Sequence, residues 1–315
     1  ASSLDITGNL TVNTSGTVTV GGGNNRLATL AGAVINFQAG TVNVFGRLTL
    51  NNGTTEISGA VINIDPQAGT VLGVTSNAFE VSGTANFTFS SGSVTIVDPN
   101  AAATTGRDLK ITSTGTINIT GGTFYLGDGV STSVSTSTIF PGFIISVGGN
   151  IINNLVLQTG GIAGRDAGLM GDLVVNGTLT LTSGKLDLNS KNLTIGNTGS
   201  IATGYDATKF IVTSGGGSLK MSTLGTGAVT YPVGPSSVSY TPFVSTNNTS
   251  GDILGVNIKN SITNATADNE KCVKLEWLGN EAVSGGNTGT ITFQWNASDQ
   301  GSTFTPAEPV IPAVC

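Results

Sequence analysis

The sequence contains no histidine, and only 10% of its 315 residues are charged. Without an imidazole, neither Ser-His-Asp hydrolysis nor His-ligated zinc chemistry is open to the chain. Charged residues make up about 25% of ordinary globular proteins, yet the hydrophobic fraction here still reaches 38%. Because a disordered chain combines low hydrophobicity with high net charge, we expect an ordered protein.

Basic residues and long apolar runs are scarce as well. Lys and Arg total 12 against 18 Asp and Glu, which gives a net charge of −6 and a pI near 4.5. The chain has no basic stripe of the kind that nucleic-acid binding needs. No apolar run approaches the ~20 residues of a membrane helix. We therefore expect neither nucleic-acid binding nor membrane insertion.

Only two cysteines are present, Cys272 and Cys315. A disulfide between them would suit an oxidising compartment and would tie the proline-spaced C-terminal segment back to the fold. Closing that long loop would contribute roughly 3 to 4 kcal/mol in the chain-entropy model. Two buried free thiols are the alternative, and we predict that the cysteines pair.

Glycine, in contrast, is abundant, with 46 residues. It opens a recurring phrase of alternating polar and apolar residues, for example GNLTV (8–12), GTVTV (16–20), GTVNV (40–44), GSVTI (92–96) and GTLTL (177–181). Such alternation after glycine is typical of a short strand that follows a tight turn. Glycines recur at 23-residue steps, from Gly69 to Gly92 to Gly115 and from Gly83 to Gly106. This spacing fits one coil of a parallel β-solenoid, in which each coil stacks its apolar residues on the next.

These patterns predict an all-β protein with two domains. Residues 1–205 are expected to form a right-handed parallel β-solenoid (β-helix), with Val, Ile and Leu inside and Thr, Asn, Arg and Lys facing water. Segments 131–138 and 160–172 are expected to leave the rod as loops. Beyond about Tyr205 lie both Trp residues and six of the nine Pro, and short alternating segments continue between turn signals. Residues 206–315 are therefore expected to form an antiparallel β-sandwich.

One stretch of the chain resembles a known family. The run NGTLTLTSGKLDLNSKNLTIG (176–196) resembles the β-helical repeats of large secreted surface proteins of Bacteroidetes. The segments FIVTSGGGSL (210–219), VTYPVG (229–234) and TFQWNA (292–297) are similar to that family too, so the resemblance covers about residues 150–310. It implies export by the type IX route, display on the cell surface or release, and an adhesin-like or structural role. The shared motifs mark no active site.

An enzyme is the competing interpretation, because parallel β-helices also host polysaccharide lyases and glycosidases. Glycoside hydrolysis needs two carboxylates about 5 to 9.5 Å apart, yet the aspartates of the first 205 residues do not recur at the 23-residue coil spacing with acidic partners. The best remaining candidate for a catalytic or sugar site is Arg165 and Asp166 with Asp172 and Asp128. A solvated loop is the alternative for this set.

Two further candidate features receive a structural interpretation. Asp128, between two glycines, is a single carboxylate and falls short of the six to eight oxygen ligands of calcium. The aromatic residues of the strand phrases are expected to stack in the core rather than to form a sugar platform: Phe37, Phe45, Phe87, Phe89 and Phe124.

The sequence thus favours a non-enzymatic extracellular structural protein, secreted or on the cell surface, that serves as an adhesin-like stalk or as a self-assembling filament subunit. It needs no cofactor or metal. The alternatives are a carbohydrate-binding module and a polysaccharide-active β-helix enzyme. The expected partners are other copies of the chain, joined head to tail, or cell-surface and extracellular glycans. The first repeat begins almost at Ala1 without a capping segment, so another copy is expected to continue its strand ladder into a filament. An upstream segment of a longer protein is the alternative cover.

Overall fold

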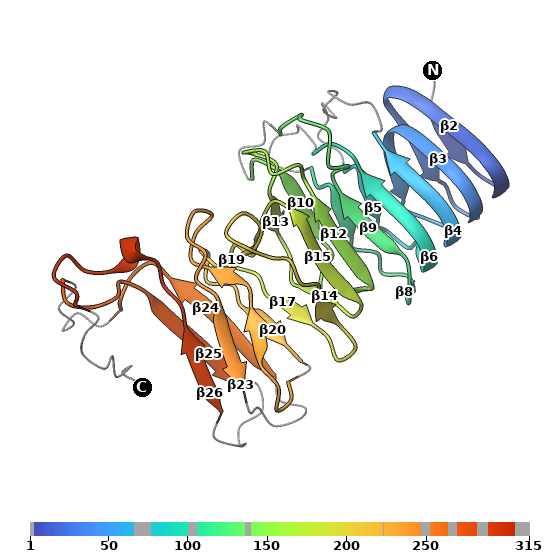
Figure 1. Ribbon diagram of the computed structural model, residues 1–315. Helices are drawn as coiled ribbons and strands as arrows, with labels where there is room; N and C mark the ends of the chain where they lie inside the picture. The colour runs from blue at the N-terminus through green and yellow to red at the C-terminus, as the bar shows by residue number, and fades with distance from the viewer. Residues whose placement is uncertain are drawn as a thin grey trace.

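The chain forms an elongated stack of β-coils with the two termini at opposite ends (Figure 1). The structure is a computed structural model, and it describes residues 3–65, 77–99, 106–135, 140–222, 224–246, 253–263, 270–281 and 289–305. Within these residues the strands form a 17-stranded sheet, a six-stranded sheet and a three-stranded sheet. Every strand pair of the largest sheet is parallel. The prediction of an all-β protein built on a large parallel sheet is confirmed.

The parallel strands stack in ladders that run along the rod. The first ladder follows β1 (Leu4–Ile6), β2 (Asn9–Thr29), β3 (Val34–Leu50), β5 (Phe79–Val81), β7 (Leu109–Ile111), β10 (Phe143–Ser146), β13 (Ala167–Leu169), β16 (Leu186–Asp187), β19 (Ile211–Val212) and β22 (Val233–Gly234). The second ladder follows β2, β3, β4 (Thr54–Ile64), β6 (Asn86–Ile96), β9 (Thr123–Leu126), β12 (Asn154–Gln158), β15 (Thr178–Ser183) and β18 (Ser200–Ile201).

A third face is split between two sheets. Near the N-terminus β8 (Ile117–Ile119) pairs with the first half of β6. Further along, the six-stranded sheet contains the parallel strands β11 (Ile151–Ile152), β14 (Leu173–Val175), β17 (Leu193–Ile195) and β20 (Leu219–Met221). The long strands β2, β3 and β4 turn corners, and so they contribute to more than one ladder.

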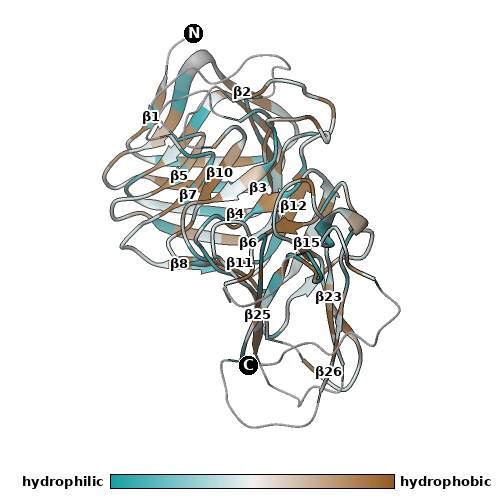
Figure 2. Cartoon of the chain, turned by 90° about the vertical axis from the view of Figure 1, so that its left-hand side faces the viewer, coloured by the Kyte–Doolittle hydropathy of each residue, from teal (hydrophilic) through white to brown (hydrophobic). Residues whose placement is uncertain are grey.

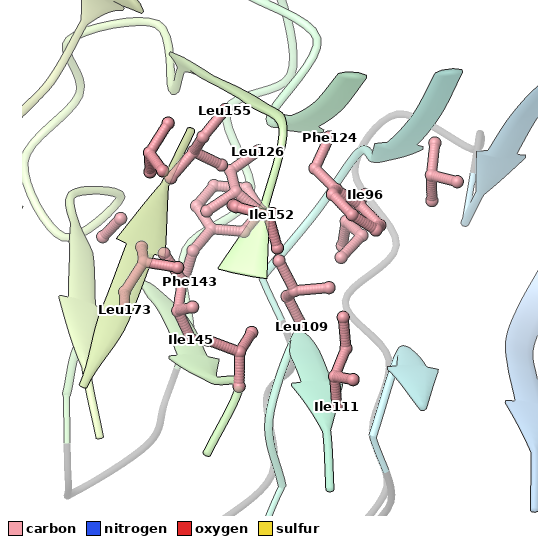
Figure 3. Close-up of a cluster of buried hydrophobic side chains, with 14 of the residues drawn as sticks. Ile96, Leu109, Ile111, Phe124, Leu126, Phe143, Ile145, Ile152, Leu155 and Leu173 are labelled. Atoms are coloured by element: carbon pink, nitrogen blue, oxygen red, sulfur yellow. The ribbon is translucent and has the colours of Figure 1, made fainter. Parts of the chain in front are cut away.

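Apolar residues fill the inside of the stack at alternate positions, as the strand phrases predict. Val42 and Val44 of β3 lie in register with Ile62 and Ile64 of β4, and all four side chains are buried. Brown and teal segments alternate along the strands in Figure 2, which follows from the two-residue period of a strand. Figure 3 shows the same stacking in the middle of the rod, where Ile96, Phe124 and Leu155 come from successive coils.

The predicted 23-residue coil is wrong, because equally spaced glycines do not lie above one another. Register gives steps of 20 residues from β3 to β4, 32 from β4 to β6 and 30 from β6 to β9. Gly92 lies over Ala60, and Gly83 lies over Asn51. The coils differ in length because segments of different size are inserted at their corners, which leaves the register of the strands intact.

Two of the predicted boundaries also change. Segment 160–172 is not a single loop, because Ala167–Leu169 forms β13 and pairs with both β10 and β16. The parallel pairing continues past residue 205, since β19 pairs with β16, β22 with β19, and β20 with β17. Phe45 is half-buried rather than in the core, whereas Phe37, Phe87, Phe89 and Phe124 are fully buried.

Antiparallel pairing is confined to the C-terminal end of the rod. There β24 (Leu254–Lys259) pairs with β20 and with β25 (Glu276–Glu281), and β23 (Phe243–Thr246) pairs with β21 (Val229–Tyr231) and β26 (Thr290–Phe293). The rings of Trp277 on β25 and Phe293 on β26 lie 4.9 Å apart between centroids, which links the two sets. A 3₁₀ turn (Ala297–Asp299) follows.

Candidate functional site

A groove on the outside of the first ladder is the best-formed surface depression among the described residues. Its volume is about 260 Å³, and it is lined by Phe140, Pro141, Gly164, Asp166, Lys185, Asp187, Val212 and Ser237. Three consecutive coils build it. Ala167 pairs with Leu186, which brings Asp166 beside Lys185 one residue earlier in each coil. Asp187 on β16 pairs in turn with Val212 on β19.

One wall of the groove depends on a glycine. The Phe140 ring packs so closely on Gly168 of β13 that a Cβ atom added there would come within 2.8 Å of the ring. Gly168 lies in register with Asp187 of the next coil. The bare backbone of β13 therefore lets an aromatic ring lie against the sheet, next to a carboxylate.

Main-chain and hydroxyl groups hold the two carboxylates of the groove in place. The N–H of Lys185 donates to Asp166 Oδ1 at 2.8 Å. The N–H of Asn189 donates to Asp187 Oδ1 at 2.8 Å, and the Ser214 hydroxyl lies 3.4 Å from each Asp187 oxygen. Burial raises the pKa of Asp187 above its ordinary value despite these donors, and the negative charge of Asp166 adds to the rise.

The structure does not bring the predicted set of Arg165, Asp166, Asp172 and Asp128 together as one site. Only Asp166 lines the groove. Asp172 precedes β14 and accepts the N–H of Asn192 at 2.8 Å. Asp128 accepts the N–H groups of the turn that follows it, at 3.0 and 2.7 Å. Alternation in the sequence places Arg165 and Asp166 on opposite sides of the chain, so one is buried while the other faces out.

Arg165 lies inside the molecule and pairs with Asp98. Its Nη1 is 2.8 Å from Asp98 Oδ1, and neither side chain is exposed. The guanidinium also donates from Nε to the Thr159 carbonyl at 3.1 Å, from Nη2 to the Val97 carbonyl at 3.0 Å, and from Nη1 to the Ser133 carbonyl. Its carbon lies 5.4 Å from the centroid of the Phe143 ring. Arg165 thus joins segments of three coils at one corner of the solenoid.

Acidic residues recur at that corner, contrary to the expectation from the sequence. Asp65, Asp98 and Asp128 each follow the paired ends of β4, β6 and β9 within two residues. Their spacing is that of the true coils, which a 23-residue period conceals. The signal was present in the sequence as two similar steps between aspartates, but only with the correct coil length.

Burial raises the pKa of Asp65 to about 7, and the charge of Asp98 adds to this rise. Asp65 is only 4% exposed and has a left-handed φ of 52°. Burial also raises the pKa of Asp98, against the opposing effect of the Arg165 guanidinium. In the described part of the chain, Asp65 Oδ2 has no hydrogen-bond partner. The corner therefore buries more acid than its one arginine neutralises.

Neither the metal nor the cysteine predictions gain a site. Among the described residues, no three Cys, Asp or Glu side chains lie close enough to hold a metal ion. Cys272 is half-buried, and Cys315 lies outside the described residues, so their pairing stays a prediction. No helix in the described residues is long and apolar enough to span a membrane.

Comparison with protein-family models, with curated proteins and with solved structures finds no match to this chain. Function is therefore inferred from the sequence and the geometry alone.

Sequence reasoning missed Phe140, Lys185 and Asp187 of the groove. Lys185 and Asp187 occur in a repeat phrase, where they have the pattern of ordinary outward positions of a strand. Their meeting with Asp166 follows from the 19-residue step between β13 and β16, which is shorter than the neighbouring coils. No local pattern predicts that step.

Proposed function

We propose that this chain is a non-enzymatic extracellular structural protein, a stalk or filament subunit that extends by end-to-end contact between copies. The observation that carries the proposal is the exposed core at the first coil. Leu4 of β1 is 41% exposed, whereas Leu27, its partner in the second coil, is fully buried. Leu10 and Val18 are likewise partly exposed, whereas their partners Ile35 and Val42 are buried. We call this surface, Leu4 with Leu10 and Val18, the end face.

Two physical terms favour a cover on the end face. Burying the apolar side chains contributes roughly 25 cal/mol per Å², and the strands of the first coil have main-chain groups that a further strand can pair with. A second copy that continues the parallel ladder satisfies both at once. A contact between two different ends of a molecule does not close on itself, and so it propagates as a filament.

Low charge supports the same proposal. Charges near the end face are paired within the molecule, because Arg26 of the second coil lies 2.9 Å from Asp5 of the first. With only 10% charged residues in the chain, little electrostatic repulsion opposes contact between copies. Location outside the cell, on the surface or secreted, rests on the resemblance to the Bacteroidetes surface proteins. Extracellular glycans are the second proposed class of partner.

The proposal includes the finer features of the fold. We take the coils to be right-handed, since nearly all crossovers between parallel strands of one sheet have that hand. We take the antiparallel strands at the C-terminal end to form a sandwich. Its core would be the ring series Tyr231, Phe243, Phe293 and Trp277, whose neighbouring centroids lie 5.4, 5.8 and 4.9 Å apart.

Electron microscopy and sedimentation of the purified chain test the assembly. We expect filaments or a concentration-dependent series of oligomers for the wild type. Leu10→Lys, which places a charge on the end face, is expected to give monomers with an unchanged circular dichroism spectrum. Val238→Lys is the matched control, because Val238 is 92% exposed and lies at the other end of the rod.

A wild-type chain that remains monomeric at high concentration, with the amides of β1 protected from hydrogen exchange, would contradict assembly through the end face. Equal assembly by Leu10→Lys and Val238→Lys would contradict it as well.

A further inference from the structure

We propose that the outer groove binds one sugar unit of a neutral polysaccharide. Sugar binding there is independent of assembly at the end face. The groove lies on β13, β16 and β19, whereas the end face belongs to β1 and β2 at the N-terminal end of the rod (Figure 1).

The charges of the groove select a neutral, hydroxyl-rich ligand. Asp166 and Asp187 present hydrogen-bond acceptors, and Lys185 presents donors between them. An anionic ligand would meet two carboxylates, and a cationic ligand would meet the ammonium group of Lys185. A sugar hydroxyl both donates and accepts, so a neutral sugar can satisfy the carboxylates and the lysine together. An apolar ligand would leave these three groups desolvated without partners.

The remaining surface of the groove suits the C–H faces of a sugar ring. Phe140 forms one wall, and Val212, although it points outward from β19, is only 1% exposed and lies at the bottom. Pairing of an aromatic or aliphatic surface with a few polar groups is the usual composition of a small-ligand site. The volume of about 260 Å³ is just below the range of sites for larger ligands, which is why we assign a single sugar unit rather than a long segment.

Preformed geometry supports binding rather than chance proximity. Asp166 and Asp187 are each fixed by a main-chain N–H at 2.8 Å. Lys185 Nζ lies 5.7 Å from the centroid of the Phe210 ring, which restrains its side chain. Gly168 is required for the position of Phe140. Ordering these groups before the ligand arrives reduces the entropy lost on binding.

Titration calorimetry and NMR with four neutral probes test this proposal: cellohexaose, maltohexaose, xylohexaose and mannohexaose. We expect at least one probe to bind the wild-type chain with a millimolar or tighter Kd, and its sugar protons to show contacts with the Phe140 ring. Asp166→Asn is expected to weaken that binding about tenfold. Asp172→Asn is the matched control, because Asp172 makes the same kind of 2.8 Å bond with a main-chain N–H but lies outside the groove.

Two further variants test the groove and the end face separately. Gly168→Ala displaces the Phe140 ring and is expected to abolish binding while the parallel fold remains. Leu10→Lys, which disrupts the end face, is expected to bind sugar as the wild type does. Failure of all four probes to bind at 10 mM overturns the proposal. Equal affinity of Asp166→Asn and Asp172→Asn, or contacts that avoid Phe140, overturns it too.

Discussion

Arg165 and Asp98 are 67 residues apart in the chain and form a fully buried ion pair, with 2.8 Å between Nη1 and Oδ1. The pair lies where the loops after β6, β9 and β12 meet, and the guanidinium donates to three main-chain carbonyls in addition. A buried charge is tolerated only when it is paired and hydrogen-bonded. Arg165 therefore fixes a corner at which coils of unequal length come together.

Removing this arginine should destabilise the fold strongly. Arg165→Met leaves Asp98 buried without its partner and three carbonyls without a donor, which we expect to cost about 3 to 5 kcal/mol. The double variant Arg165→Met with Asp98→Asn should recover part of that loss. Denaturant unfolding measures both. Arg26→Met is the control, because the Arg26–Asp5 pair is exposed and should contribute under about 1 kcal/mol. Equal losses for the two single variants would contradict the buried role of Arg165.

Asp65 should make the protein less stable as pH rises. Its pKa is about 7 in the folded state against an ordinary value of 3.8, so the folded state holds the proton more tightly than the unfolded state. The resulting stability is fully present below about pH 4 and is lost as pH rises towards 7. Allowing for solvent screening at the corner, we expect a loss of about 1 to 3 kcal/mol.

Asp65→Asn should remove that pH dependence, as followed by unfolding at several pH values between 4 and 8. Asp206→Asn should act in the opposite sense, because hydrogen bonds from Thr208 lower the pKa of the exposed Asp206 carboxylate. A wild-type stability that increases from pH 4 to pH 7 by an amount that Asp65→Asn abolishes would refute the assignment.

Gly92 should be irreplaceable at its corner, where β6 turns from one face of the solenoid to the next. Its φ is +92°, and an added Cβ atom would come within 2.3 Å of the Ala60 carbonyl oxygen of the preceding coil. We expect Gly92→Ala to cost about 1 to 3 kcal/mol from backbone strain, and more from the steric clash. Gly8 has no atom within 4 Å of its added Cβ and no positive φ, so Gly8→Ala should change thermal stability by no more than about 0.5 kcal/mol. Similar melting curves for the two variants would argue against coil stacking at this corner.

Cys272 and Cys315 are still predicted to form a disulfide. Mass analysis under non-reducing conditions should show a mass two hydrogens lower than the reduced chain, and no alkylation without a reductant. Cys272→Ser should lower the unfolding free energy by roughly 3 to 4 kcal/mol in the chain-entropy model. Two thiols that alkylate readily in the native protein would exclude the disulfide.

Much of the fold follows from local pattern. Alternation in phrases such as GTVNV (40–44) predicts which side chains enter the core, and Val42 and Val44 are indeed buried. Coil length does not follow in the same way, because inserted segments at a corner change the count between strands without affecting their pairing. Glycines that are 23 residues apart, such as Gly92 and Gly115, occupy different corners.

The sequence by itself determined the class of fold and the inward face of each strand, since a two-residue period and β-favouring side chains act within a few residues. Only the tertiary structure decided which side chains meet across coils. Asp166 reaches Lys185 and Asp187 because one coil is short, and Asp98 reaches Arg165 because two insertions end at the same corner. Such meetings depend on the summed length of whole coils, and each inserted residue shifts the partner that comes next. For this reason both the buried ion pair and the outer groove become visible only once the chain is wound.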